Sequence, residues 1–436
     1  MTAASATPDV PSPLVPGKPT PARRWITLGI LTVVYILNYV DRTLPSVLAK
    51  PIQDDLKLTD GQLGLLGGLY FALFYGVLSL PVAWIADRSN RVRIVAVACA
   101  LWSAATLACG LARGYGELAT ARMAVGVGEA GGVAPSYSII ADLFPGERRA
   151  TALSLYNLGP PLGQMLGVAG GAALAASGGW RHAFLVVGAI GIIAALIASI
   201  ALREPARRIM DAAVPNAPEA PARIGFTTSV RLFWADKTLR LAAFAAAASA
   251  FIGSGTLAFL TLFLMREKAM TLQQVGSYFA VLLGICVCSG IFASGRLVDV
   301  LSRRSTAAYG LIPAVATAVS LPFFLGFVAA PDWRIALALL AVPLFFNYFY
   351  LTPAGALVQA RVPAERRATA SAVMLLVMNL IGGGLGPTFL GMVSDAAHDG
   401  HSDTPLQWAF YAMAPVFAIA IVLHLAVARR LRRPAP

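Results

Sequence analysis

Apolar stretches long enough to cross a lipid bilayer follow one another along almost the whole chain. Hydrophobic residues make up 58% of its 436 positions, and charged residues only 13%. A membrane-spanning helix needs about 20 apolar residues to cross a hydrocarbon core about 30 Å thick. The sequence therefore predicts an all-α membrane protein with twelve transmembrane helices, at 25–49, 62–86, 93–112, 118–142, 148–176, 181–202, 238–265, 272–298, 306–329, 333–360, 367–394 and 406–428.

More polar segments divide these spans into two groups of six. Pro- and Ala-rich residues 1–24 predict a disordered cytoplasmic tail, and residues 203–237 predict a cytoplasmic loop. The loop separates an N-terminal six-helix bundle, 25–202, from a C-terminal one, 238–428. Residues 429–436 predict a basic cytoplasmic tail.

The net charge of +13 comes from 34 basic and 21 acidic residues. In a soluble protein such an excess is typical of nucleic-acid binding. Here, with the N-terminus in the cytoplasm, the cytoplasmic segments hold 25 of the Lys and Arg residues and the opposite segments hold 7. Basic loops stay on the cytoplasmic side of a membrane. The charge therefore predicts a multi-pass protein of the inner (plasma) membrane with both termini cytoplasmic, and no nucleic-acid partner.

Two short motifs occur once in each group of spans. Residues 145–152 read Pro-Gly-Glu-Arg-Arg-Ala-Thr-Ala, and residues 363–370 read Pro-Ala-Glu-Arg-Arg-Ala-Thr-Ala. Both copies lie between a fourth and a fifth span. Asp87-Arg88-x₂-Arg91 and Asp299-x₃-Arg303-Arg304 lie between a second and a third span. The chain is therefore expected to be two similar six-helix units in parallel repeat.

Twelve spans, a long central loop and these repeated motifs resemble the major facilitator superfamily. That family carries Gly-x₃-Asp-Arg-x-Gly-Arg-Arg/Lys between its second and third spans. The second half keeps the glycine, Gly295, whereas the first half has Ala83, Asn90 and Val92 where the pattern has two glycines and a base. The resemblance implies two pseudo-symmetric bundles that transport by alternating access, and no enzymatic activity.

A narrower resemblance rests on residues 38–42, Asn-Tyr-Val-Asp-Arg, and 126–130, Gly-Val-Gly-Glu-Ala. Both stretches look like the spinster family, whose eukaryotic members export sphingosine-1-phosphate or lysophospholipids. The Ala-rich composition, with Arg favoured over Lys, indicates a bacterial member.

The resemblance also implies a cytoplasmic gate. Its charges would pair with neighbouring span ends while the transporter faces outward, and separate when it opens inward. Solvated helix ends are the alternative, because charges near a helix terminus need no special role. The expected gate residues are Asp87, Arg88, Arg91, Asp299, Arg303, Arg304, Glu147, Arg148, Glu365 and Arg366.

Four ionisable side chains lie well inside predicted spans: Asp41, Arg42, Arg122 and Glu129. An unpaired charge at mid-membrane costs about 2.5–3.5 kcal/mol on insertion scales, so such residues pair or face a cavity. The first and fourth spans are neighbours in the family fold. We therefore expect Arg42 to pair with Glu129, and Asp41 with Arg122.

These four residues are the main candidates for function. Asp41 is the predicted proton carrier and Glu129 the second candidate, because a carboxylate whose distance to an arginine changes can take up or release a proton. Arg42 does not lose its proton. The parallel N–H groups of its guanidinium, which we call its fork, suit a phosphate or carboxylate headgroup. Arg122 is a further substrate-binding candidate. A static salt-bridge cluster that holds the first six helices together is the alternative.

The second half has no such charge inside a span. Asn347 and Tyr350, with aromatic neighbours, are expected to line an apolar wall opposite the charged one, with simple packing as the alternative. His424 is expected at the membrane interface. This asymmetry suits an anionic amphiphile such as a lysophospholipid or sphingosine phosphate, and it suits an aromatic organic anion equally.

No phosphate-binding loop, zinc-binding His pair or nucleophile elbow occurs in the sequence. The expected transporter therefore needs no cofactor or metal, only a proton gradient, and acts as a monomer among membrane lipids. Two alternatives remain. One is a proton-coupled organic-anion or sugar-phosphate symporter of the same superfamily, and the other is a transporter-like sensor that binds without transport.

Overall fold

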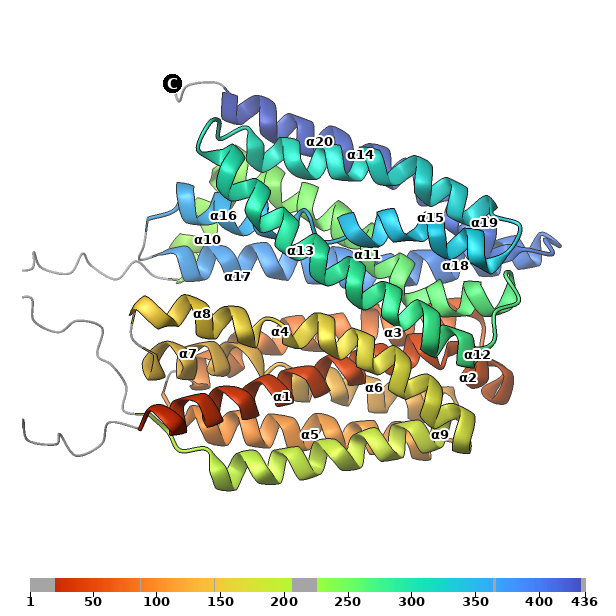
Figure 1. Ribbon diagram of the computed structural model, residues 1–436, viewed down its shortest axis with the longest axis horizontal. Coiled ribbons are helices and arrows are strands. Elements are labelled where there is room, and N and C mark those ends of the chain that lie inside the picture. Colours follow the sequence, from red (N-terminus) through yellow and green to blue (C-terminus); the bar gives the residue numbers. More distant parts are fainter. Residues whose placement is uncertain (1–19, 87, 145, 206–225, 364–365, 433–436) are drawn as a thin grey trace, which may run out of the picture.

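Within the residues that the structure describes, every regular element is a helix, which confirms the predicted all-α class. The structure is a computed structural model that describes residues 20–86, 88–144, 146–205, 226–363 and 366–432. The long helices share a common direction (Figure 1). We call the end where the first helix begins and the last one ends the tail end, and the opposite end the far end.

The N-terminal half forms one bundle. Its helices are α1 (Pro21–Val47), α2 (Ala49–Leu56), α3 (Asp60–Gly67), α4 (Leu69–Ala86), α5 (Arg91–Leu111), α6 (Tyr115–Glu129), α7 (Val133–Leu143), α8 (Gly146–Tyr156) and α9 (Gly159–Ala201). The 43-residue α9 changes direction at Gly179, whose φ of 81° lies in the left-handed region that glycine adopts without strain. It therefore supplies both the fifth and the sixth predicted spans.

The C-terminal half forms a second bundle. It contains α10 (Phe226–Ala235), α11 (Lys237–Arg266), α12 (Leu272–Gln274), η1 (Val275–Phe279), α13 (Ala280–Ser302), α14 (Ala308–Ala329), α15 (Trp333–Phe346), α16 (Leu351–Arg361), α17 (Arg367–Val377), η3 (Met378–Leu385), α18 (Gly386–Asp399), α19 (Pro405–Tyr411) and α20 (Ala414–Arg432). The segments η1 and η3 are single stretches of wider π-helix.

The prediction of a loop over 203–237 was wrong in part, because α10 lies inside it. Apolar residues spaced three and four apart give this helix one apolar face, and Val230, Phe233 and Trp234 pack against the C-terminal bundle. Of the predicted tails, residues 1–19 and 433–436 lie outside the described residues, whereas α1 already begins at Pro21.

Nine stretches of the described chain are long and apolar enough to cross a membrane. One of them, Thr151–Ala201, has 51 residues and covers two predicted spans. The nine stretches therefore account for ten predicted spans. The helix α1 and the pair α6–α7 account for the other two, so the arrangement is consistent with the predicted twelve. The span predicted over 118–142 is interrupted between Glu129 and Val133, where α6 ends and α7 begins.

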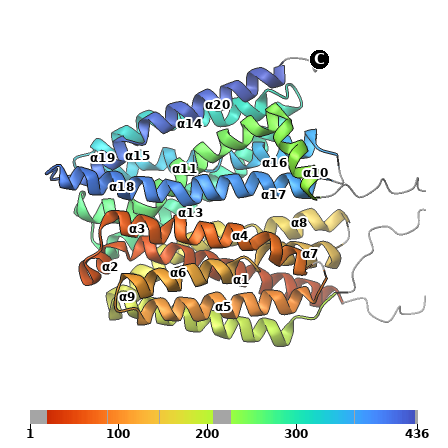
Figure 2. The same ribbon diagram turned by 180° about the vertical axis from the view of Figure 1, so that it is seen from behind.

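The two bundles contact each other mainly through α3 with α18, α9 with α13, and α4 with η3. Of these pairs, α3 and α18 lie side by side at the far end in both views (Figures 1 and 2).

Candidate functional site

A cavity of about 930 Å³ lies between the bundles. Helices α1, α4 and α6 provide one wall with Arg42, Phe71 and Arg122, and α11 and α13 provide part of the other with Leu257 and Ile291. Two helix interruptions border the cavity, one between α15 and α16 and the other at η3. Irregular backbone at membrane depth is tolerated where it lines such a cavity.

Arg42 is the charged centre of the N-terminal wall. Its Nε donates to Oε2 of Glu129 on α6, at 2.5 Å, which confirms the predicted pair. The guanidinium carbon lies 5.0, 4.8 and 4.7 Å from the ring centroids of Tyr39, Phe71 and Tyr75. These rings restrain the guanidinium and contribute cation–π attraction.

The two terminal nitrogens of Arg42 make no hydrogen bond to any described residue. The side chain remains 21% exposed, whereas Glu129 is fully buried. Because Arg42 lines the cavity, these nitrogens are the part of the guanidinium that a ligand can reach. A guanidinium held at Nε and open at its fork is suited to a bidentate oxyanion.

Asp41 and Arg122 do not form the second predicted ion pair. Both are buried, with 2% of their surface exposed, but no nitrogen–oxygen contact within 4 Å joins them. Asp41 instead interacts at longer range with Arg122 and Glu129, and it faces Thr106 of α5. Adjacent residues of a helix point about 100° apart. Because Arg42 points at the cavity, Asp41 faces α5 instead.

Unpaired polar atoms surround this cluster. Oδ1 of Asp41, Nε of Arg122, Oε1 of Glu129 and both amide atoms of Asn38 are buried without a hydrogen-bond partner among the described residues. Buried polar groups are normally satisfied by protein or by ordered water. The interior of the N-terminal bundle is therefore polar around these side chains.

Asn347 and Tyr350 both line the cavity, in the break between α15 and α16. The same break presents Tyr348, whose hydroxyl accepts a hydrogen bond from Nε2 of Gln164 on α9 at 2.9 Å. This bond crosses from one bundle to the other. Sequence reasoning missed Gln164 and the three aromatic residues around Arg42, because no local pattern distinguishes them from packing residues.

His424, which the sequence predicts at the membrane interface, lies inside the C-terminal bundle. It is 4% exposed, and its Nε2 shares a hydrogen bond of 2.9 Å with Oγ of Ser249 on α11. The apolar positions around it on α20 place this face of the helix inside the C-terminal bundle, where a neutral imidazole can be satisfied by a hydroxyl.

Among the described gate residues, only Arg91 forms an ion pair, and its partners are not other gate residues. Arg91 is buried, and it binds Asp142 at 2.6 Å and Glu204 at 2.6 Å. Ser138 adds a third acceptor at 2.7 Å. All three partners belong to the N-terminal half. Arg91 therefore links helices within that half and does not connect the two bundles.

Of the other expected gate residues, those that the structure describes form no ion pair between the bundles. Among the described residues, none of the following forms an ion pair with another: Arg88, Arg148, Asp299, Arg303, Arg304 and Arg366. Arg88 lies over the ring of Trp84. Asp87, Glu365 and the side chain of Glu147 lie outside the described residues.

Comparisons of sequence identify relatives of this chain. Its residues 31–387 and 290–436 match the Major Facilitator Superfamily. An MFS-type efflux pump of Mycolicibacterium smegmatis is 34% identical over 386 residues, which cover 87% of this chain and 86% of the pump. A sphingosine-1-phosphate transporter of Danio rerio is 27% identical, with 89% of this chain and 79% of that protein covered.

A solved structure agrees with these relatives. A bacterial homologue of the human lysosomal transporter spinster, in an inward-facing and unoccupied conformation, superimposes with a TM-score of 0.87. It is 30% identical, and the match covers 96% of this chain and 100% of the homologue. The chain therefore belongs to the spinster family of the major facilitator superfamily, and it is a multi-pass membrane transporter rather than an enzyme.

Proposed function

We propose that this transporter moves an anionic amphiphile, of the lysophospholipid or sphingosine-phosphate kind, by proton-coupled alternating access. It acts as a monomer in the inner (plasma) membrane, with the tail end toward the cytoplasm. The Arg-rich last turn of α20 supports this orientation. The likeness to an inward-facing relative supports the assignment of this conformation as open to the cytoplasm.

The open fork of Arg42 is the observation that carries the proposal. Phosphate and carboxylate headgroups accept two parallel hydrogen bonds from a guanidinium. The rings of Tyr39, Phe71 and Tyr75 and the Glu129 carboxylate already hold this guanidinium in place. Little side-chain entropy is then lost when a headgroup binds, which favours affinity.

The opposite wall supports an apolar tail. Its lining side chains are largely aliphatic or aromatic, and include Leu257, Phe279, Leu283, Val287 and Ile291. A cavity of about 930 Å³ lies near the upper end of the range for small-molecule sites, roughly 300–1,000 Å³. A charged wall facing an apolar wall matches a molecule with a charged head and an alkyl chain. The relative that is a sphingosine-1-phosphate transporter is consistent with this class.

Charge balance supports coupling to protons. Asp41, Arg42, Arg122 and Glu129 together carry no net charge when all four are ionised. One proton on Asp41 or Glu129 leaves the cluster with one positive charge, which an anionic headgroup neutralises. Proton and anion therefore each favour binding of the other. Protonation of Glu129 also removes the negative charge beside the guanidinium, so Arg42 attracts the anionic headgroup more strongly.

Transport into proteoliposomes tests the headgroup site. We expect Arg42→Ala to lose at least about tenfold in lysophospholipid transport, the effect of losing about 1.4 kcal/mol or more of headgroup binding. Arg42→Lys should retain a part of it, because the charge stays and the fork is lost. The exposed Arg113→Ala in the same bundle is the control. Transport by Arg42→Ala at the rate of the native protein would contradict the assignment.

The same preparation distinguishes the other candidate functions. Short organic anions and sugar phosphates that outcompete long-chain lysolipids would identify a symporter for small anions. Saturable binding of lysolipid with no flux in either direction, under an imposed proton gradient, would identify a sensor.

A further inference from the structure

Side-chain oxygens from three helices gather inside the N-terminal bundle. Asn38 and Asp41 are three residues apart on α1, so they share a face of that helix. Asp41 lies near Thr106 of α5 and Glu129 of α6, and Glu129 in turn lies near Asn38. All four side chains are at most 2% exposed, and they lie outside the lining of the central cavity. The bundle therefore contains a second polar position, distinct from the cavity.

The hydroxyl proton of Thr106 is already engaged. Its Oγ1 donates to the carbonyl oxygen of Trp102, one turn earlier on α5, at 2.9 Å. A hydroxyl has only one proton and an ionised carboxylate has none, so Thr106 and Asp41 present lone pairs to each other. Oδ1 of Asp41 is buried with no hydrogen-bond partner in the described part of the chain. Two acceptors thus lie together with no described donor between them.

Glu129 presents a further oxygen of this kind. Its Oε2 accepts from Arg42, whereas its Oε1 is buried and has no partner among the described residues. Both amide atoms of the neighbouring Asn38 are buried and unpartnered in the same part of the chain. A buried oxygen that loses its hydration without gaining a partner is costly. These oxygens therefore require either water or a cation as a partner.

The backbone beside them favours a cation. The helix α6 ends at Glu129, and the chain becomes helical again only at Val133. The carboxyl end of a helix carries a partial negative charge, which stabilises a cation placed next to it. Transporters use such interrupted membrane helices to bind Na⁺. Carboxylate, hydroxyl and amide oxygens are also the ligands that hard cations prefer.

Charge balance selects a monovalent ion. The two carboxylates, Asp41 and Glu129, and the two guanidinium groups, Arg42 and Arg122, together carry no net charge when all are ionised. A bound Na⁺ leaves one positive charge, as a proton does. A divalent ion would leave two positive charges in a buried region, at a much larger desolvation cost.

We propose that side-chain oxygens of Asn38, Asp41, Thr106 and Glu129 form a Na⁺ site inside the N-terminal bundle. The ion supplies the positive partner that the buried oxygens lack, and it competes with a proton for the carboxylates. Because it leaves the same charge as a proton, it also favours an anionic headgroup on Arg42. This last step, unlike the binding of the ion, rests on the proposed function.

Thermal unfolding of the full chain in detergent, without substrate, measures binding of the ion. NaCl replaces N-methylglucamine chloride at constant ionic strength, in weakly alkaline buffer that keeps the carboxylates ionised. A ligand that binds only the folded state raises the Tm as its concentration passes the Kd. We expect the Tm to rise with NaCl and to change little with KCl, because the larger K⁺ needs more oxygen ligands than four side chains offer.

Thr106 allows a matched test. Thr106→Val replaces the hydroxyl by a methyl group of similar shape. The NaCl concentration at half of the Tm rise should then increase at least about tenfold, which is about 1.4 kcal/mol of binding. Asn38→Leu should act in the same way. Thr256→Val is the control, because its hydroxyl is also buried and unpartnered among the described residues but lies on α11 of the other bundle.

Equal responses to NaCl and KCl would indicate a general salt effect and would overturn the proposal. So would a NaCl response that Thr106→Val and Asn38→Leu leave unchanged, or one that Thr256→Val weakens equally. If Thr106→Val does not fold, Asn38→Leu and Thr106→Ser decide, since the serine keeps the oxygen and should keep the response.

The Na⁺ site and the proposed function can fail separately. No response of the native protein to NaCl would assign water to this position and reject the site, while proton-coupled transport of lysolipid could still be measured. A selective NaCl response in a protein that transports no lysolipid would support the site and reject the proposed function.

Discussion

The two bundles share a repeated sequence, yet they use polar residues in opposite ways. The N-terminal half holds a cluster of four charged side chains, of which Asp41, Arg122 and Glu129 are buried and Arg42 is partly exposed. The C-terminal half buries a neutral pair in its interior, Ser249 with His424. Because one half carries the charges and the other the apolar wall, the duplicated fold produces a cavity with two chemically different sides.

The repeated loop motif shows the same contrast. Arg91 and Arg303 occupy matching positions in the two copies. Arg91 is 3% exposed and binds two carboxylates and a hydroxyl, whereas Arg303 lies exposed on the surface. The motif alone therefore does not decide what its arginine does. Glu204, which follows the sixth span, supplies a partner in the first half.

The largest expected effect comes from removing a charge on the N-terminal side. Asp41→Asn should abolish substrate accumulation driven by a proton gradient, because the variant cannot carry the proton that balances the anion. Downhill exchange of substrate should continue. Flux in proteoliposomes with and without a pH gradient measures both, with the exposed Asp54→Asn as control. Accumulation at the native level in Asp41→Asn would assign the proton to another residue.

The two copies of the motif arginine should differ in their contribution to stability. Arg91→Ala leaves two partly buried carboxylates without a partner, which costs about 3 kcal/mol of unfolding free energy. Arg303→Ala removes an exposed charge and should cost about 0–1 kcal/mol. Unfolding in detergent compares the two variants. Equal losses would mean that Arg303 is also engaged, for example in the outward-open conformation.

A change on the apolar wall should alter affinity according to chain length. Ile291→Ser exposes a hydroxyl to the cavity and removes apolar contact, which should weaken long-chain substrates several-fold, at about 0.8 kcal/mol per buried CH₂. Short-chain analogues should be affected less. Binding across a chain-length series tests this, and Ile285→Ser, which is 64% exposed on the same helix, is the control. Equal weakening of all lengths would place the tail elsewhere.

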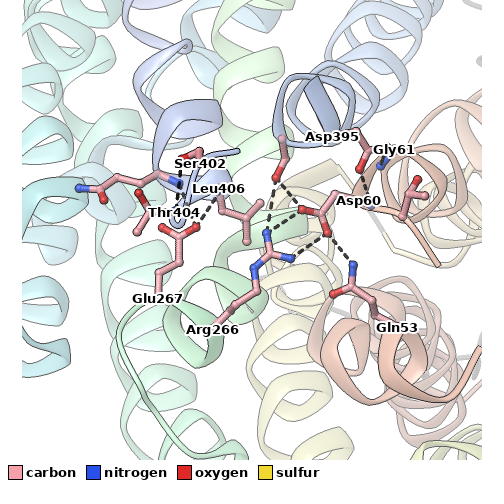
Figure 3. Close-up of polar contacts among 12 residues, drawn as sticks. Gln53, Asp60, Gly61, Arg266, Glu267, Asp395, Ser402, Thr404 and Leu406 are labelled. Atoms are coloured by element: carbon pink, nitrogen blue, oxygen red, sulfur yellow. Dashed lines mark hydrogen bonds and ion pairs between the residues drawn. The ribbon is translucent and has the colours of Figure 1, made fainter. Parts of the chain in front are cut away.

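The smallest expected effect concerns an acid of the C-terminal half outside the spans. Glu267 accepts from the N–H groups of Leu406 and Gln407 at the start of α19, and burial raises its pKa above the usual 4.5 (Figure 3). The folded state therefore holds this proton more tightly than the unfolded chain. That stabilisation is complete below pH 4.5 and is lost as the pH rises through the raised pKa.

Glu267→Gln keeps the accepting oxygen and removes the titration. We expect the Tm of the variant to equal that of the native protein in acid and to exceed it by about 1–2 °C at pH 7, since a shift of a few tenths of a kcal/mol moves Tm by that amount. The exposed Asp403→Asn is the control. A parallel pH dependence of Tm in the native protein and Glu267→Gln would show that another group titrates.

Local pattern was sufficient for much of this protein. Runs of apolar residues and repeated motifs predict the helical class, the two bundles and the superfamily, because span length depends only on consecutive residues. The pair between Arg42 and Glu129 was also predictable, since four costly charges in two neighbouring spans leave few ways to pair.

Tertiary structure alone decided where the remaining polar groups found partners. The three rings around Arg42, the bond from Gln164 to Tyr348, the partners of Arg91 and the ion pair of Asp60 with Arg266 join residues far apart in the sequence. Such contacts depend on how helices rotate and cross, and local periodicity does not specify these angles. The sequence thus determined which charges enter the membrane, and the packing of the helices decided which of them face the cavity.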